Sequence, residues 1–342
     1  MSETSNVKKK STFRVLEHKD LKKASSFLNE FARDVFIGLN KSPKQLSSKY
    51  FYDEKGSKIY EEIMKLPEYY LVKSEAEILK YYANDIGNLV KSNPFHLIEL
   101  GAGNGEKTAV LLNNFVKKQL DFEYVPIDIS YSAVESLIDK LNEEIPNLRS
   151  HGFVAEYFDA LKWLSENDKS TRNLVLFLGS NIGNFMYSEA KEFLFSMWHS
   201  LNDGDLVVIG FDLRKNIDIM SAAYNDSQHV TKKFNMNLLK RINTELGGNF
   251  DLDKFKHYEP FNVYSGAMES FLVSQDVQEV YIKLLKKKFY FDKFEPIFME
   301  HSYKYLDKDI KKLAEITGYR LVKNFYCKNH YFVDSVWEVK KE

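Results

Sequence analysis

The feature that most constrains the fold of this chain is the segment FHLIELGAGNG, residues 95–105, in which an apolar run ends in three glycines spaced two apart. The apolar run predicts a buried strand, and the following EKTAVLL has the spacing of a helix. Glycine suits such a sharp turn because the backbone can approach a ligand there with no Cβ in the way. The free N–H groups at the start of the helix make this turn a candidate binding site.

Strand and helix patterns continue to alternate after this turn. Further strands are expected within residues 123–130, 151–158, 173–180 and 205–213. The alternation predicts a doubly wound parallel sheet. Two more strands, joined by a short turn, are predicted within residues 317–339. A closing antiparallel pair is typical of a seven-stranded Rossmann-like sheet, whereas dehydrogenases have six strands.

The remaining segments predict a second, smaller α+β domain beside the sheet, so the whole chain is assigned to the α/β class. Ser74 and Glu77 have the spacing of a capping box, which predicts that a helix begins near Ser74. The expected divisions are a disordered tail of residues 1–15, a sheet domain of residues 75–213 and 305–342, and a second domain of residues 16–74 and 214–304.

Composition excludes several classes of function. The 342 residues carry 48 Lys and Arg against 49 Asp and Glu, and this balance disfavours nucleic acids and anionic membranes as partners. Apolar runs are too short to span a bilayer, and the start MSETSNVKKK lacks an apolar signal region. The single cysteine, Cys327, and the scattered histidines argue against a disulfide framework or a metal site. We therefore expect a cytoplasmic monomer that acts on a small molecule.

The glycine turn favours one class of cofactor. A dinucleotide site carries a third glycine three residues after the second, but Glu106 stands in that position. A carboxylate there would repel a pyrophosphate, so NAD is disfavoured. The pattern Glu99-x-Gly101-x-Gly103 is instead the one used for S-adenosylmethionine, which has no phosphate. A tight structural turn is the alternative interpretation of the glycines.

Two further acidic positions support a nucleoside cofactor. Asp128 ends the second strand of the sheet domain, where a carboxylate can accept hydrogen bonds from both ribose hydroxyls. Glu156 and Tyr157 are expected to end the third strand, where a polar group and an aromatic face commonly hold adenine. Alternatively, Asp128 caps the next helix and Tyr157 is a core aromatic.

Several blocks of the sequence resemble the histidine-specific Nα-methyltransferase family. The resemblance covers roughly residues 45–340, and its most specific blocks are FLGSNIGNF and YFYDxxGS…LPEYY. That family makes hercynine, the trimethylated betaine of histidine, from histidine and S-adenosylmethionine in the first step of ergothioneine biosynthesis. The other matching blocks are LIELGAGNGEKT, YVPIDIS, AAYNDSQHVTKKFNMNLL and MEHSYKY.

The resemblance implies roles for individual residues. It places Gly179, Asn184 and Tyr224 around the carboxylate and amine of the substrate, and Tyr69, Glu300 and Ser302 around the imidazole ring. Tyr60 matches an aromatic wall that is usually Phe. It implies that the cofactor is held by Tyr52, Gly101, Lys107, Asp128, Glu156 and Tyr157, to which the glycine pattern adds Gly103.

Two positions depart from the family pattern. Glu156-Tyr157 replaces Asp-Phe and keeps an acid beside an aromatic ring. Ser270 stands where a Met that packs on the histidine ring is expected, and the smaller side chain enlarges the pocket. Tryptophan or a related aromatic amino acid is therefore the alternative substrate.

Methyl transfer from a sulfonium needs a straight line of approach and a neutral amine, but no covalent partner from the protein. We expect Tyr52 and Tyr69 to act at the reacting amine, because aromatic faces attract the growing cation. Structural roles remain open for some residues. Asn184 could cap a helix, and Tyr224 and the Tyr69-Tyr70 pair could be packing residues. Glu300 could be a solvated strand residue, and Lys107 could be a lysine on the exposed face of a helix. A catalytically silent nucleoside-binding module is a further alternative.

Overall fold

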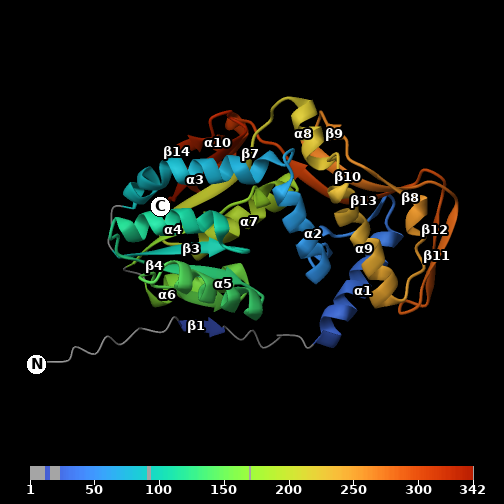
Figure 1. The fold of residues 1–342 in the computed structure, drawn as a ribbon, viewed down its shortest axis with the longest axis horizontal. Helices are drawn as coiled ribbons and strands as arrows, with labels where there is room; N and C mark the ends of the chain where they lie inside the picture. Colours follow the sequence, from blue (N-terminus) through green and yellow to red (C-terminus); the bar gives the residue numbers. More distant parts are fainter. Residues whose placement is uncertain (1–11, 16–23, 91–93, 169–170, 342) are drawn as a thin grey trace, which may run out of the picture.

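The main sheet of the protein has eight strands in the order β1-β5-β4-β3-β6-β7-β15-β14 (Figure 1). The computed structural model describes residues 12–15, 24–90, 94–168 and 171–341. The strands are β1 (Thr12–Val15), β3 (Phe95–Leu100), β4 (Phe122–Asp128), β5 (His151–Val154), β6 (Arg172–Phe177), β7 (Leu206–Asp212), β14 (Tyr319–Tyr326) and β15 (Phe332–Val339).

Seven of these strands have the arrangement predicted from the sequence. Strands β5, β4, β3, β6 and β7 are parallel, and β15 and β14 close the sheet as an antiparallel pair. The eighth strand was not predicted, because residues 12–15 were expected in a disordered tail. They form β1 and pair in parallel with β5, whose open edge offers unpaired N–H and C=O groups. Residues 1–11 of that tail lie outside the described residues.

Helices cover both faces of the sheet (Figure 1). Successive side chains of a strand point to opposite faces, so Leu97 joins one core with α3 and α4, while Ile98 joins a second core with α6 and α7. The helices around the sheet are α3 (Tyr70–Leu89), α4 (Glu106–Lys117), α5 (Tyr131–Glu144), α6 (Tyr157–Asn167), α7 (Tyr187–Ser200) and α10 (Asp307–Ile316).

Helix α3 begins one turn earlier than the capping pattern predicted. Its first residue is Tyr70, and Ser74 is buried within the helix. The buried Tyr70 hydroxyl donates to Asp212 at the end of β7, at 2.8 and 2.9 Å from the two carboxylate oxygens. This bond fixes the first turn of α3 against the sheet, so the helix extends upstream of the position that Ser74 would cap.

The remaining elements lie beside the sheet, on the right in Figure 1. A second sheet has the order β2-β13-β10-β8, with β9 paired to β10, and β11 and β12 form a separate hairpin. No helix among the described residues is long and apolar enough to cross a membrane. The elements of this region are α1 (Ala24–Asn40), β2 (Lys44–Gln45), η1 (Ser48–Tyr50), α2 (Glu54–Lys65), α8 (Ile217–Tyr224), α9 (Val230–Leu246), η3 (Leu252–Lys254), β8 (Phe255–Tyr258), β9 (Phe261–Asn262), β10 (Ala267–Ser274), β11 (Gln278–Ile282), β12 (Lys287–Phe291) and β13 (Pro296–Tyr303).

A buried carboxylate holds the start of α9. Asp226 accepts hydrogen bonds from the backbone N–H groups of Gln228, Val230 and Thr231, at 3.1, 2.9 and 2.8 Å. Burial opposes ionisation of this carboxyl group, but the N–H donors outweigh it and lower the pKa of Asp226. The first turns of α9 therefore have a fixed position and satisfied N–H groups.

We expect Asp226→Ala to lower the free energy of unfolding at neutral pH by about 1–3 kcal/mol, because it leaves buried N–H groups unpaired. The pKa of Asp226 is lowered by folding, so its contribution is present above its ordinary value of 3.8 and is lost as the pH falls through the folded pKa. Urea unfolding of both proteins at neutral pH and near about pH 3 measures this. Equal stability at neutral pH would contradict the assignment.

Candidate active site

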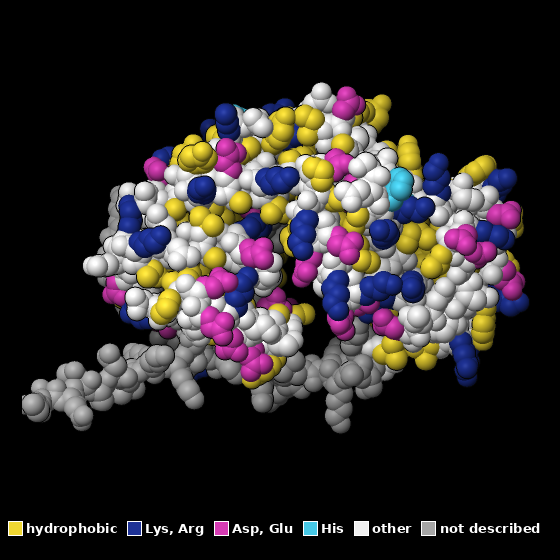
Figure 2. Space-filling view, in the orientation of Figure 1, with side chains coloured by type: hydrophobic (Ala, Val, Ile, Leu, Met, Phe, Trp, Pro, Cys, Tyr) yellow, Lys and Arg dark blue, Asp and Glu magenta, His cyan; other side chains and the backbone are white. Residues whose placement is uncertain are grey.

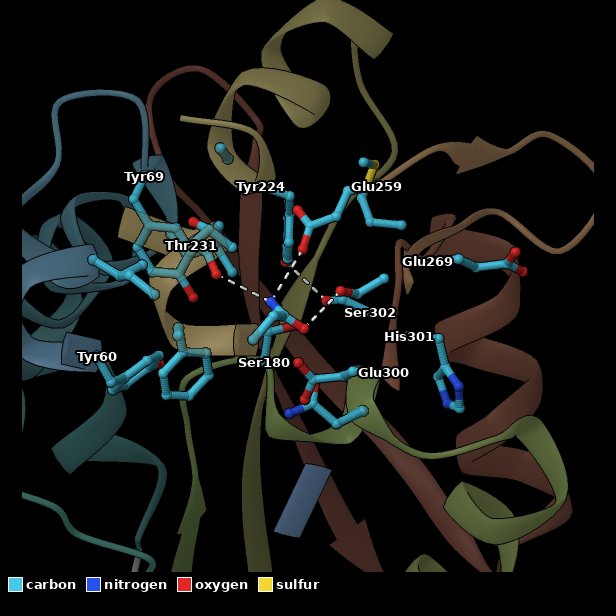
Figure 3. A pocket seen from close by; sticks show the side chains of 18 of the residues that line it. Tyr60, Tyr69, Ser180, Tyr224, Thr231, Glu259, Glu269, Glu300, His301 and Ser302 are labelled. Atoms are coloured by element: carbon cyan, nitrogen blue, oxygen red, sulfur yellow. Dashed lines mark hydrogen bonds between the residues drawn. The ribbon is translucent and has the colours of Figure 1, made fainter. Parts of the chain in front are cut away.

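One pocket collects the expected substrate residues. It encloses about 710 Å³, counting its open mouth, and residues from both parts of the molecule line it (Figure 3). Residues expected around the substrate or the reacting amine that line it are Tyr52, Tyr60, Tyr69, Gly179, Asn184, Tyr224, Ser270, Glu300 and Ser302.

Aromatic rings form one wall of this pocket. Tyr52 precedes α2, and its ring meets those of Tyr60 and Phe234 edge-on, with centroids 5.5 and 5.4 Å apart. Tyr69 precedes α3 and meets Tyr224 with ring centroids 6.4 Å apart. The Tyr52 residue as a whole is 47% exposed, but its hydroxyl group is buried, and this burial raises the pKa of Tyr52 well above 10. Burial likewise raises the pKa of Tyr69, so both hydroxyls stay neutral at neutral pH.

Glu300 lies on β13 and lines the pocket rather than facing bulk solvent (Figure 3). It pairs with Ser270 of β10 in the register of the second sheet. Burial, followed by the negative charge of Glu259, raises the pKa of Glu300 to about 8. The free pocket therefore holds a carboxyl group that is ready to become an anion when a cation or an N–H donor arrives.

Ser302 and Tyr224 share a buried lysine. The hydroxyl oxygens of Tyr224 and Ser302 are 2.8 Å apart, and Lys304 Nζ donates to them at 2.6 and 2.8 Å. Lys304 also pairs with Asp212 at 2.9 Å, with both side chains fully buried. Burial opposes the charge of Lys304, but Asp212 and Tyr224 outweigh it and raise its pKa. Lys304 remains a cation and fixes both hydroxyl groups.

The glycine turn lies at the carboxyl edge of the main sheet. Gly101 and Gly103 have φ of 70° and 56°. A Cβ on Gly103 would meet no atom within 4 Å, whereas one on Gly101 would lie 2.8 Å from the Tyr157 hydroxyl. Asp128 ends β4, and its carboxylate accepts the Ser130 N–H at 2.9 Å. An open glycine backbone beside a carboxylate and an aromatic ring has the donors, acceptors and space that a nucleoside needs.

Glu156 and Tyr157 begin a helix rather than end a strand. Strand β5 ends at Val154, the exposed Glu156 precedes α6, and Tyr157 is its first residue. Burial and the charges of Asp128 and Glu156 raise the pKa of Tyr157 to about 12. The structure therefore brings Gly101, Asp128, Glu156 and Tyr157 together, although β5 is shorter than predicted.

Lys107 connects the glycine turn to the pocket. It forms an ion pair with the buried Glu75 of α3, whose other oxygen accepts the Gly179 N–H at 2.6 Å. A Cβ on Gly179 would lie 3.3 Å from Lys107 Nζ. Because Gly179 also lines the pocket, the pocket and the glycine turn adjoin at the loop that contains Gly179.

Sequence reasoning assigned no role to several polar residues of this site, among them the four described next. Thr231, Asn235 and Glu259 line the pocket, and Lys304 lies behind it. Lys304 had a signal, because Glu300, Ser302 and Lys304 are spaced two apart and so share one face of an extended chain. Glu259 lies in the short irregular segment between β8 and β9, where no helical or strand periodicity predicts which way a side chain points. Within the described residues, no group of three or more His, Cys, Asp or Glu could hold a metal ion.

We expect Glu300→Gln to remove part of the pH dependence of stability. The pKa of Glu300 rises from an ordinary 4.5 to about 8 on folding, so its contribution is full below 4.5 and is lost as the pH rises through about 8. The free energy of unfolding of the unmodified protein should therefore fall more steeply over this range than that of the variant. Urea titrations at several pH values measure the two profiles, and parallel profiles would refute the shift.

Comparison with known proteins identifies the family to which this chain is similar. Residues 31–339 match the family described as histidine-specific methyltransferase, SAM-dependent. The histidine N-alpha-methyltransferase of Mycolicibacterium smegmatis is 33% identical, with 85% of this chain and 90% of that protein covered. The ergothioneine biosynthesis protein 1 of Schizosaccharomyces pombe is 31% identical, with 82% of this chain and 37% of that protein covered.

A more distant relative has a different substrate in its name. The L-tryptophan methyltransferase trpM of Psilocybe serbica is 29% identical, with 85% of this chain and 87% of that protein covered. The family match spans nearly all of the described chain and includes both the glycine turn and the pocket. This protein therefore belongs to the family of histidine-specific methyltransferases that depend on S-adenosylmethionine.

Proposed function

We propose that this enzyme transfers methyl groups from S-adenosylmethionine to the α-amine of free L-histidine and forms hercynine. The observation that carries the proposal is that Glu300, Asn184 and Tyr224 line one pocket. This pocket adjoins the glycine turn through Gly179 and Lys107. A free amino acid there can present its amine to the cofactor while its ring reaches Glu300.

The cofactor is proposed to lie along the glycine turn. Asp128 would accept hydrogen bonds from the ribose hydroxyls, and Glu156 and Tyr157 would hold the adenine. Tyr52, Gly101 and Gly103 complete the set, and Lys107 is proposed to act through its ion pair with Glu75, which also fixes Gly179. When bound, S-adenosylmethionine supplies the electrophilic methyl group.

The carboxylate of the substrate is proposed to lie between the Asn184 amide and the Tyr224 hydroxyl. Lys304 donates to the Tyr224 oxygen, and the phenolic hydrogen is available to the substrate when Ser302 is the donor in the bond between the two hydroxyl groups. Neutral donors fix the amino acid without a tight ion pair at its amine. The amine can then lose its proton before each transfer, as an in-line displacement requires.

Aromatic faces suit an amine that gains methyl groups. Tyr52, Tyr60 and Tyr69 form the wall where the amine is proposed to lie, and Tyr52 and Tyr69 are proposed to act at the reacting nitrogen. Each cation–π contact contributes about 0.5–2 kcal/mol and needs no N–H on the cation. Such a wall tolerates the mono-, di- and trimethylated products in turn.

The proposal is tested with the purified protein, S-adenosylmethionine and each free amino acid in separate reactions. We expect mass spectrometry to show mono-, di- and trimethylated histidine in succession, with trimethylhistidine as the final product. Methyl transfer to another amino acid but none to histidine would overturn the proposal. Cofactor binding without a saturable amino acid site would indicate a silent binding module.

Ser270 motivates the alternative substrate, tryptophan. Ser270→Met fills the space that a larger ring would occupy, so activity on tryptophan should fall while the KM for histidine stays equal or decreases. Steady-state kinetics with both amino acids measure the change. If both substrates respond alike, Ser270 does not set the size of the pocket.

We further infer that the enzyme acts as a cytoplasmic monomer in the first step of ergothioneine formation. The name of the Schizosaccharomyces pombe relative supports the pathway. The single cysteine, Cys327, is buried, so the described fold needs no oxidising compartment.

A further inference from the structure

The Glu259 carboxylate has one oxygen without a partner inside the pocket. Its side chain is 2% exposed, and Oε1 lies 2.6 Å from His257 Nε2. The buried Oε2 has no hydrogen-bond partner among the described residues. Burial raises the pKa of Glu259, and hydrogen bonds from His257 and Ser270 partly offset this. The single hydrogen of the Ser270 hydroxyl goes to Asn235 Oδ1 at 2.8 Å. A buried unpaired acceptor is costly, so a donor is expected on whatever enters the pocket.

Glu259 and Glu300 both line the pocket (Figure 3), and the side chain of the substrate is proposed to lie beside them. The Asn235 amide, which donates to Glu259 Oε1 at 3.4 Å, lines the same pocket. The negative charge of Glu259 is, after burial, the largest cause that raises the pKa of Glu300. Positive charge near this space comes from Lys304, which lowers the pKa of Glu300 but is already bound to Asp212. The His257 ring also lowers the pKa of Glu259, although burial outweighs it. The ring end of the pocket is therefore rich in acceptors.

We propose that Glu259 is a specificity-determining residue that accepts a hydrogen bond from the second ring nitrogen of the substrate, so that histidine binds as an imidazolium between Glu259 and Glu300. The inference rests on the proposed function. A neutral ring that enters takes the proton held by Glu300. The ring becomes a cation, Glu300 becomes an anion, and each ring N–H then faces one carboxylate.

This arrangement would make the space beside Ser270 unfavourable for indole, although the smaller side chain enlarges the pocket. The space beside Ser270 is lined by Asn235, Glu259 and, at 3.5 Å from the Ser270 hydroxyl, His257 Nε2. Indole has a single N–H, so it would leave one buried carboxyl group without a donor. Sites built from buried polar groups reject such analogues strongly.

Nuclear magnetic resonance of the bound ligand tests the protonation state directly. The unmodified protein is saturated with S-adenosylhomocysteine and L-histidine labelled with ¹⁵N in the ring, at about pH 8, where a free imidazole is neutral because its pKa is about 6.5. We expect both ring nitrogens to give the signals of an imidazolium. The widely separated signals of a neutral tautomer would overturn the proposal.

Kinetics of Glu259→Gln provide the second test. We expect the KM for histidine to rise about tenfold to a hundredfold, as for the loss of a hydrogen bond to a charged group, with little change in kcat or in the KM for the cofactor. Glu279→Gln is the matched control, because it removes the same charge from an exposed residue of β11 that pairs with Lys288. A KM for Glu259→Gln within twofold of the control would contradict the role of Glu259.

These outcomes separate the inference from the function on which it rests. If the unmodified enzyme methylates histidine while the bound ring is neutral and Glu259→Gln behaves as the control, only the role of Glu259 fails. If the unmodified enzyme does not methylate histidine, the proposed function itself fails. A thermal melt of Glu259→Gln with and without cofactor shows that the variant is folded before its kinetics are compared.

Discussion

The site depends on the buried ion pair between Asp212 and Lys304. Asp212 ends β7 of the main sheet, and Lys304 directly follows β13 of the second sheet, so one contact of 2.9 Å joins the two parts of the molecule. Both partners have further hydrogen bonds: Asp212 accepts from the Tyr70 hydroxyl and from a second buried lysine, Lys215, and Lys304 donates to Tyr224 and Ser302. A buried pair is tolerable only when its other positions are satisfied in this way.

The fold was largely predictable because its signals are local. Apolar runs followed by helical spacing identified the parallel strands, and the closing pair identified the sheet type. The N-terminal strand and the start of α3 had weaker sequence signals. Strand β1 is four residues long and depends on the open edge of β5, which no local pattern reveals. The start of α3 was misplaced because Ser74 and Glu77 imitate a cap, whereas Tyr70 is anchored by a residue far along the chain.

The residues of the candidate site were predictable where they belong to recognisable sequence motifs, and not elsewhere. The expected substrate positions from Tyr52 to Ser302 line one pocket, and the positions expected to hold the nucleoside cluster around Gly101. Their roles remain proposals. Glu259 belongs to none of the matching blocks, and Asn235 stands in one of them without an implied role. Tertiary contacts bring both residues to the lining of the pocket. Ser270 shows the same limit, because its size suggested an enlarged pocket but gave no sign that its hydroxyl bonds to Asn235.

The wide spacing of the pocket residues along the chain has a consequence for synthesis on the ribosome. Strands β3 to β7 and the glycine turn are complete once residue 212 has emerged, but β15 must still pair with β7, and β13 must still bring Ser302 to Tyr224. Domains fold as their segments emerge. A nascent chain therefore completes the glycine turn and the parallel strands before it has any pocket beside them, and that pocket closes only after β13 has emerged.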